Sequence, residues 1–97
     1  MLIEAQKAAQ EGKIIVVDFW STGCAPCAMM APKFEALSKK YPQAVFLKVN
    51  GDECEQCCAD AGIAAFPSFQ IWKNCTCVDE VVGVNEPGLR VAIERNL

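Results

Sequence analysis

Two thiols stand three residues apart in the segment Cys24-Ala25-Pro26-Cys27. If a helix begins at the first cysteine, this spacing places both sulfur atoms on one face near the helix N-terminus. Unpaired backbone N–H groups and the helix dipole favour the thiolate form of a cysteine there. A thiolate attacks disulfides, and a neighbouring thiol can then close the ring and release the product. The motif, with Ala25 and Pro26 as its supporting residues, therefore predicts thiol–disulfide exchange.

The elements on either side of this motif are predicted to be a strand and a helix. Residues 14–20 are nearly all apolar and often β-branched, which is typical of a parallel strand buried on both faces. A short loop at residues 21–23 leads to Cys24. The following helix is expected to close at Tyr41-Pro42, with a kink at Pro32. Its buried face is marked by side chains at spacings of three and four, namely Cys27, Met30, Phe34 and Leu37.

The remaining segments complete an α-β-α-β-α-β-β-α order. A helix is expected from residue 2 to about residue 11, and a second buried strand at residues 45–49. A third helix follows Glu53 and ends near Gly62. Alternating residues 68–72 predict an antiparallel strand with one buried face, which turns at residues 73–76 into a strand at 78–82. With a last helix after Asn85, the sequence predicts a single α/β domain over residues 1–97.

The composition narrows the classes of partner and of chemistry. Apolar residues make up 53% of the 97 residues, so the chain can bury enough surface to fold. The net charge of −3 argues against nucleic acid and anionic membranes as partners. No apolar stretch is long enough to cross a membrane. The chain has no histidine, which excludes histidine-based acid–base catalysis and Cys/His zinc sites.

The seven cysteines bear on the cellular compartment. In a small secreted protein they would predict a disulfide scaffold. Here the odd number, the high aliphatic content and an amphipathic N-terminus unlike a signal peptide favour a reducing compartment instead. The sequence therefore predicts a cytoplasmic protein.

Taken together, these features resemble the thioredoxin family along nearly the whole chain, and small eukaryotic thioredoxins of animal type in particular. An acid in the core strand, Asp18, lies six residues before Cys24, and a helix proline and a later proline follow in register. Cys54 resembles an extra cysteine of animal-type thioredoxins. The matching segments are Val16-Val17-Asp18-Phe19-Trp20, Cys24-Ala25-Pro26-Cys27, Met29 with Ala31-Pro32, Phe66-Pro67-Ser68-Phe69, Lys73-Asn74 and Gly83.

Several positions depart from the family pattern. Gly23 stands where the family usually has a tryptophan, and so lacks an aromatic wall of the docking surface. Ala25 replaces a usual glycine, and Ala28 replaces a common cation near the thiolate. The chain also opens at the expected first helix, so the usual first strand of the family is not expected. Residues 45–49 are then expected to form an edge of the sheet.

The resemblance implies a thioredoxin-like fold, with a mixed sheet of four or five strands between helices, and a protein-disulfide reductase. Cys24 is implied to attack and Cys27 to resolve. Asp18 is implied to be the buried acid behind them; burial raises a carboxyl pKa, so Asp18 would move a proton to or from Cys27. Lys48 is implied to point inward and to tune Asp18, and a purely structural Asp18–Lys48 pair is the alternative.

The resemblance also implies residues that contact the substrate. A cis Phe66-Pro67 bond would leave backbone groups of Phe66 free to pair with an extended substrate. Trp20 and Gly83 are implied to border the same surface. The alternatives are an ordinary trans proline, a core tryptophan and a plain turn glycine. No bound cofactor is implied: reducing equivalents would come from NADPH through thioredoxin reductase, and the partners would be that reductase and disulfide-containing proteins such as peroxiredoxins.

Five cysteines lie outside the motif, and three interpretations stay open for them. Cys54-x-x-Cys57 with Cys75-x-Cys77 is similar to a zinc site, but a thioredoxin-like fold would place these pairs at opposite ends of a strand of about 17 Å. No metal is therefore expected. The other interpretations are reduced thiols without a function and regulatory oxidation. Two alternative functions remain: a thioredoxin-like interaction or metal-binding module, and a disulfide oxidase or isomerase, which usually carries a histidine inside the motif.

Overall fold

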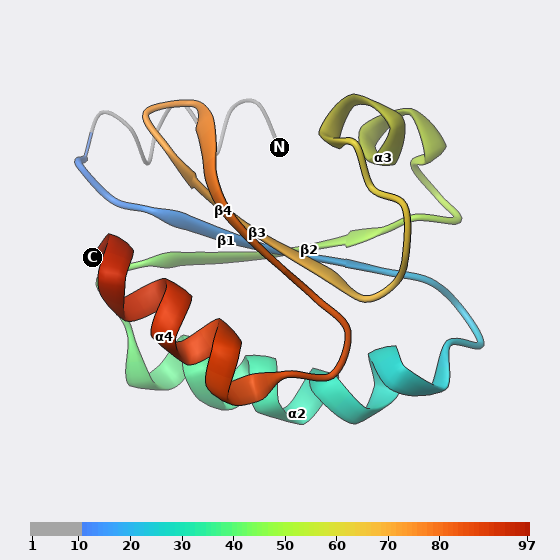
Figure 1. Ribbon diagram of the computed structural model, residues 1–97, viewed down its shortest axis with the longest axis horizontal. Helices are drawn as coiled ribbons and strands as arrows, with labels where there is room; N and C mark the ends of the chain where they lie inside the picture. Colours follow the sequence, from blue (N-terminus) through green and yellow to red (C-terminus); the bar gives the residue numbers. More distant parts are fainter. Residues whose placement is uncertain (1–10) are drawn as a thin grey trace.

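The computed structural model describes residues 11–97 (Figure 1). The helix predicted for residues 2 to about 11 falls almost wholly outside the described residues. From residue 14 onward the predicted order of strands and helices is confirmed. The elements are β1 (Ile15–Trp20), α2 (Ala25–Lys40), β2 (Val45–Asn50), α3 (Glu55–Ala61), β3 (Ser68–Lys73), β4 (Thr76–Val82) and α4 (Glu86–Asn96).

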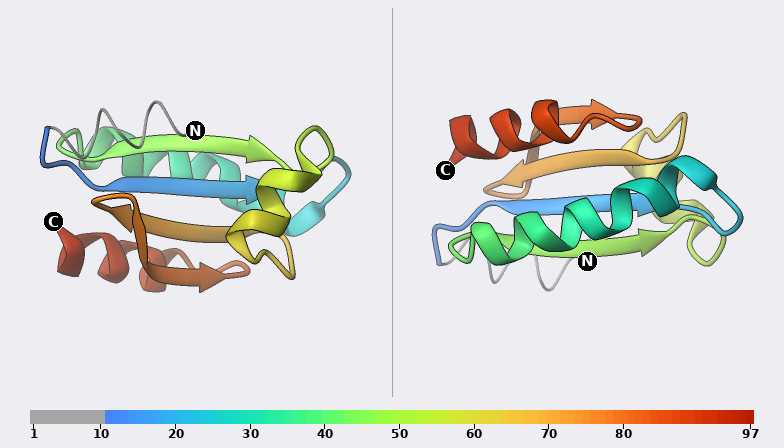
Figure 2. Two further views of the ribbon diagram at one scale, coloured as in Figure 1. Left: turned by 90° about the horizontal axis from the view of Figure 1, so that it is seen from above. Right: turned by 90° about the horizontal axis from the view of Figure 1, so that it is seen from below.

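The strands of the described residues form one mixed sheet in the order β2-β1-β3-β4. β1 and β2 are parallel, β3 is antiparallel to β1, and β4 is antiparallel to β3. Helices α2 and α4 lie on one face of the sheet and α3 lies on the other (Figures 1 and 2). The predicted α/β class with a four-stranded mixed sheet is confirmed. Because β1 and β2 are parallel, their carboxyl ends lie at the same end of the sheet, where α2 and α3 begin.

Strand β1 is the centre of the hydrophobic core and fixes the position of the loop before Cys24. Its residues are buried up to Phe19, as predicted for a strand covered on both faces. Val16 belongs to the cluster packed under α2 and α4, whereas Val17 and Phe19 belong to the cluster under α3. No helix within residues 11–97 has the length and apolar character that crossing a membrane requires.

Strand β2 is less buried than its apolar sequence predicts. Its residues are half-buried, and Lys48 is exposed. In the part of the chain that the structure describes, β2 pairs with β1 alone and is an edge strand. The second neighbour that would bury both sides of the strand is therefore not among residues 11–97.

Strand β3 is more buried than its alternating sequence predicts. Ser68, Phe69, Gln70 and Ile71 are all buried, so the prediction of a single buried face is wrong. The reason is that β3 lies between β1 and β4, with helices on both faces of the sheet. Its polar side chains tolerate burial because they are hydrogen-bonded; the Ser68 hydroxyl, for example, donates to the Ala65 carbonyl at 2.6 Å.

Replacing Gln70 by methionine is expected to destabilise the fold. The Gln70 side-chain amide donates to the Ala61 carbonyl at 2.8 Å and to the Glu80 carboxylate at 2.9 Å, and its oxygen accepts from the Trp72 indole N–H at 2.9 Å. Methionine keeps the volume but removes all three bonds and leaves the half-buried Ala61 carbonyl and Trp72 indole N–H without this partner, which costs on the order of 1–3 kcal/mol. Urea denaturation of the oxidised protein measures this loss.

A matched control is available on the surface of α3. The Gln56 side chain donates to the Asp60 carboxylate at 2.8 Å, and both residues are exposed. Gln56→Met is therefore expected to change the free energy of unfolding by less than about 0.5 kcal/mol. Equal losses in the two variants would contradict the role given to Gln70.

Candidate active site

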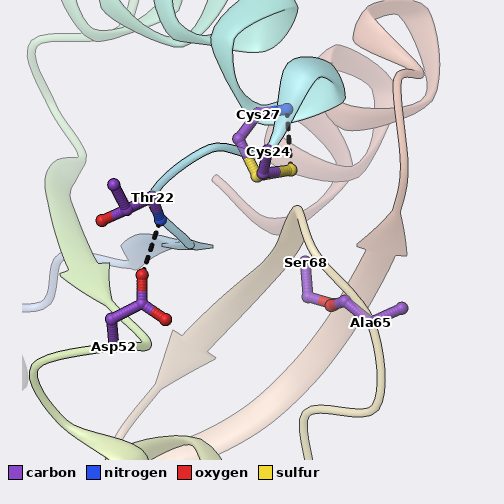
Figure 3. The surroundings of a disulfide bond; sticks show 6 residues. All are labelled: Thr22, Cys24, Cys27, Asp52, Ala65 and Ser68. Carbon is purple, nitrogen blue, oxygen red and sulfur yellow. Dashed lines mark hydrogen bonds between the residues drawn. A yellow bond between two sulfur atoms is a disulfide. The ribbon is translucent and has the colours of Figure 1, made fainter.

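Cys24 and Cys27 are joined as a disulfide at the start of α2 (Figure 3). Cys24 is the N-cap of the helix, and its Sγ accepts a hydrogen bond from the backbone N–H of Cys27 at 3.2 Å. The two Cα atoms are 5.2 Å apart. Cys24 is half-buried, whereas Cys27 is buried with 7% of its surface exposed. Solvent and a partner protein therefore reach the first sulfur more readily than the second.

A pocket of about 470 Å³ opens beside this disulfide. It extends from the loop before Cys24 to the carboxyl ends of β1 and β2 and brings together most of the residues predicted to form the site. Of those residues, the lining contains Asp18, Trp20, Cys24, Ala25, Cys27 and Lys48. Trp20 is half-buried at this rim and forms part of the pocket lining. Pro26 is exposed and does not line the pocket.

Asp18 is the buried carboxylate of this pocket. Only 3% of its surface is exposed, and its Oδ1 has no hydrogen-bond partner among the described residues. Burial raises the pKa of Asp18 to about 6, and the positive charge of Lys48 opposes that rise. A carboxyl group with this pKa exchanges protons near neutral pH.

Lys48 lies opposite Asp18 in the β1–β2 register, as the neighbouring strands were predicted to place it. Its side chain is exposed, and it lines the same pocket as Asp18. The edge position of β2 is the reason, because a lysine there keeps its ammonium group in water. Lys48 therefore acts on Asp18 through charge across the pocket.

Replacing Lys48 by methionine is expected to raise the pKa of Asp18 above about 6, since the charge that lowers it is removed. A carbon-detected NMR titration of the Asp18 carboxyl in the oxidised protein measures the change. Lys39→Met is the control, because Lys39 lies on exposed α2 surface and pairs with Glu35 at 3.7 Å. A pKa that moves equally in both variants would argue against a specific effect of Lys48.

The segment around Pro67 forms a second group of predicted residues. The Phe66–Pro67 peptide bond is cis, and Pro67 is buried. The Gly83 N–H donates to the Pro67 carbonyl at 2.9 Å, so the structure brings Gly83 to this segment. The Phe66 ring covers Gly51 so closely that a Cβ there would lie 2.5 Å from a ring carbon. These residues do not line the pocket, but the Ala65–Ser68 turn lies in the surroundings of the disulfide (Figure 3).

A second disulfide joins Cys54 and Cys57 at the start of α3. It corrects the interpretation of these two residues as reduced thiols, and it also removes them from the four cysteines that resemble a zinc site. The signal was present in the sequence, because the spacing repeats that of Cys24 and Cys27 after the next parallel strand. Cys58, Cys75 and Cys77 are free thiols.

A zinc site, another of the three interpretations of the extra cysteines, finds no support in the described residues. Cys75 and Cys77 lie in and just after the β3–β4 turn, at the end of β3 opposite to α3. No cluster of three or more cysteine, aspartate, glutamate or histidine side chains within residues 11–97 is placed to hold a metal ion.

A cysteine pair that caps a helix beside a buried carboxylate, on a mixed four-stranded sheet, defines a thiol–disulfide oxidoreductase. The thioredoxin family model matches residues 5–95, and the chain belongs to the thioredoxin family. It is 44% identical over 87 residues to thioredoxin-1 of Schizosaccharomyces pombe, which covers 90% of this chain and 84% of that protein. The alternatives of an interaction module, a metal-binding module or an oxidase are not favoured, and the chain is a protein-disulfide reductase.

Solved structures agree with this assignment. A thioredoxin from Nicotiana alata superposes with a TM-score of 0.93 at 35% identity, covering 98% of this chain and 83% of that one. A second match comes from a structure of the thiol-resolving mechanism in a yeast mitochondrial 1-Cys peroxiredoxin via glutathione and thioredoxin systems. It has a TM-score of 0.88 at 26% identity and covers 98% of this chain and 89% of that chain. The thioredoxin-like fold that the sequence implied is confirmed.

Proposed function

We propose that Cys24 is the attacking thiol of this reductase and that Cys27 is the resolving thiol. The observation that carries the assignment is the difference in exposure, since Cys24 is half-buried and Cys27 is buried beneath it. The thiolate of Cys24 attacks one sulfur of a substrate disulfide, and the other substrate sulfur leaves as a thiol. The thiolate of Cys27 then attacks Cys24 Sγ, which releases the second substrate thiol and forms the Cys24–Cys27 disulfide.

Asp18 is the proton acceptor that we assign to Cys27. Both residues line the same pocket, and the pKa of Asp18 at about 6 leaves the carboxylate mostly ionised at pH 7. An ionised carboxylate in that position can take the proton from the Cys27 thiol as it attacks. Lys48 supports this role by holding the pKa of Asp18 below the value that burial alone would give.

The substrate surface in this proposal combines Trp20 at the pocket rim with Phe66, Pro67 and Gly83. The Gly83–Pro67 hydrogen bond and the placement of the 65–68 turn near the disulfide support it. An extended substrate strand would pair with backbone groups of this segment. Ala25 and Pro26 are the supporting residues of the cysteine motif and leave its exposed side uncharged.

The partners in this proposal are thioredoxin reductase, which supplies electrons from NADPH, and protein disulfides. Peroxiredoxins are a supported substrate class, because one structural relative comes from work on the resolution of a peroxiredoxin thiol. The chain would act as a single domain over residues 1–97, in the cytoplasm and without a bound cofactor.

Insulin reduction in the presence of NADPH and a eukaryotic thioredoxin reductase tests the proposal. The wild-type protein is expected to consume NADPH and to precipitate the insulin B chain, and the double variant Cys24→Ser/Cys27→Ser is expected to do neither. If dithiothreitol supports insulin reduction by the wild-type protein but reductase with NADPH does not, the electron source is wrong while the site assignment stands. Activity in the double variant would overturn the site assignment itself.

A further inference from the structure

The second disulfide repeats the local arrangement of the first. The Cα atoms of Cys54 and Cys57 are 5.3 Å apart, against 5.2 Å for Cys24 and Cys27. In both pairs the Sγ of the first cysteine accepts a hydrogen bond from the backbone N–H of the second, at 3.2 Å. Each ring closes within one turn of the chain, so each bond can open and close without movement of a distant element.

The second disulfide also lies at the same end of the sheet as the first, at the carboxyl ends of β1 and β2. The Gly51 N–H donates to the Trp20 carbonyl at 2.7 Å, and the Thr22 N–H donates to the Asp52 carboxylate at 2.8 Å (Figure 3). These bonds join the end of β1 and the loop before α2 to the loop before α3. Cys24 is the N-cap of α2 and Cys54 is the N-cap of α3. These two helices lie on opposite faces of the sheet (Figure 1). Cys54 and Cys57 are both half-buried, so a small reductant in solution can reach them.

The charges near the two pairs differ. Asp52, Glu53 and Glu55 flank the second pair in sequence and are exposed, whereas the first turn of α2 carries no acidic residue. Carboxylates near sulfur disfavour the thiolate. The pKa of the neighbouring Cys58 thiol is raised by its burial first and then by Asp52 and Glu55. The reduced second pair is therefore expected to attack other disulfides more slowly than Cys24 does.

We propose that Cys54 and Cys57 form a second redox-active disulfide. Dithiol reductants reduce this disulfide to two thiols, and the cyclic disulfide form of the same reductants oxidises the two thiols again. A thiolate of the dithiol attacks one sulfur of the Cys54–Cys57 bond, and the other sulfur leaves as a thiolate that takes a proton from solvent. The second thiolate of the reductant then attacks the reductant's first sulfur in the mixed disulfide, and the sulfur of the chain leaves as a thiolate that takes a proton from solvent. The reductant becomes a cyclic disulfide, and two thiols remain on the chain. This inference does not depend on the roles assigned to Cys24 and Cys27.

A redox titration of the Cys24→Ser/Cys27→Ser variant tests this proposal, because the first couple is absent there. The folded protein is equilibrated in buffers of reduced and oxidised dithiothreitol, quenched with acid, unfolded and alkylated. Mass spectrometry of the peptide that contains residues 54–58 counts the alkylated thiols. Two labels on Cys54 and Cys57 are expected to appear and disappear together as the ratio is changed in either direction, while Cys58 stays labelled throughout.

Wild-type protein and single variants keep the proposal falsifiable if the double variant does not fold. In wild-type protein the same peptide is expected to show the same paired loss of labels. Cys57→Ser is expected to abolish it, and Cys58→Ser, the matched control at the neighbouring buried thiol, is expected to leave it intact. The proposal is overturned if Cys54 and Cys57 are labelled even in the most oxidising buffer. It is also overturned if Cys58→Ser, and not Cys57→Ser, removes the transition.

Discussion

Cys27→Ser is expected to convert this reductase into a trap for its substrates. Cys24 is half-buried and can still attack a substrate disulfide, but the buried sulfur that would release the product is missing. Turnover of insulin is expected to fall to the background rate, and a covalent mixed disulfide is expected to accumulate. Non-reducing gel electrophoresis with mass spectrometry would identify the complex and locate the bond at Cys24.

Two further variants separate this outcome from a general loss of structure. Cys24→Ser is expected to abolish turnover without forming a mixed disulfide, because the attacking atom itself is absent. Cys77→Ser is expected to keep turnover within a few-fold of the wild-type rate, since Cys77 is an exposed free thiol on β4, remote from the pocket. Normal turnover by Cys27→Ser would mean that another cysteine resolves the intermediate. Trapping through Cys27 in the Cys24→Ser variant would reverse the order that we assign.

The part of the site that sequence predicts well depends on local patterns. The apolar run of residues 14–20 predicts a strand wherever it lies, and the spacing of Cys24 and Cys27 places both thiols in the first turn of whatever helix follows. The turn at residues 73–76 is predicted for the same reason, and the structure confirms it with positive φ angles at Asn74 and Cys75. Such signals need no knowledge of the distant chain.

The parts that sequence predicts poorly depend on neighbours in space. Residues 45–49 are as apolar as a buried strand, yet their burial depends on a second neighbouring strand, which the described residues do not supply. Gln70 is polar yet buried, because the Ala61 carbonyl of α3 and the Glu80 carboxylate of β4 reach its side chain from other elements. The Cys54–Cys57 spacing fits a zinc half-site as well as a disulfide, so the sequence alone leaves both open.

The position of Asp18 can be predicted from the sequence, but its pKa cannot. Its place in the strand before the cysteines is visible in the sequence, but its pKa depends on burial under α2 and on the distance to the Lys48 charge. Burial raises the pKa from 3.8 to about 6, so the carboxyl holds its proton in the folded protein over a range where the unfolded chain has lost it. The folded state is therefore favoured at low pH, and this contribution is lost as the pH rises from about 4 through about 6.

Asp18→Asn is expected to remove this pH dependence and to stabilise the oxidised protein at pH 7. A pKa raised from 3.8 to about 6 corresponds to on the order of 3 kcal/mol lost by the wild-type protein at neutral pH, which is the upper limit of the gain. The asparagine cannot accept a proton from Cys27, so reductase turnover is expected to fall on the order of a hundredfold even as stability rises. Urea denaturation between pH 4 and pH 8 and insulin reduction at pH 7 measure the two effects.

The opposite signs of these two effects distinguish a catalytic acid from a structural one. A carboxylate kept only for an ion pair with Lys48 would leave turnover unchanged and would lower stability when replaced. Asp60→Asn is the matched control, because it removes the same charge from an exposed position on α3 and is expected to alter neither turnover nor the slope of stability with pH. A gain in stability at pH 7 with wild-type turnover would leave Asp18 as a buried acid without a part in proton transfer. A loss of both stability and turnover would show that its oxygens hold the fold together.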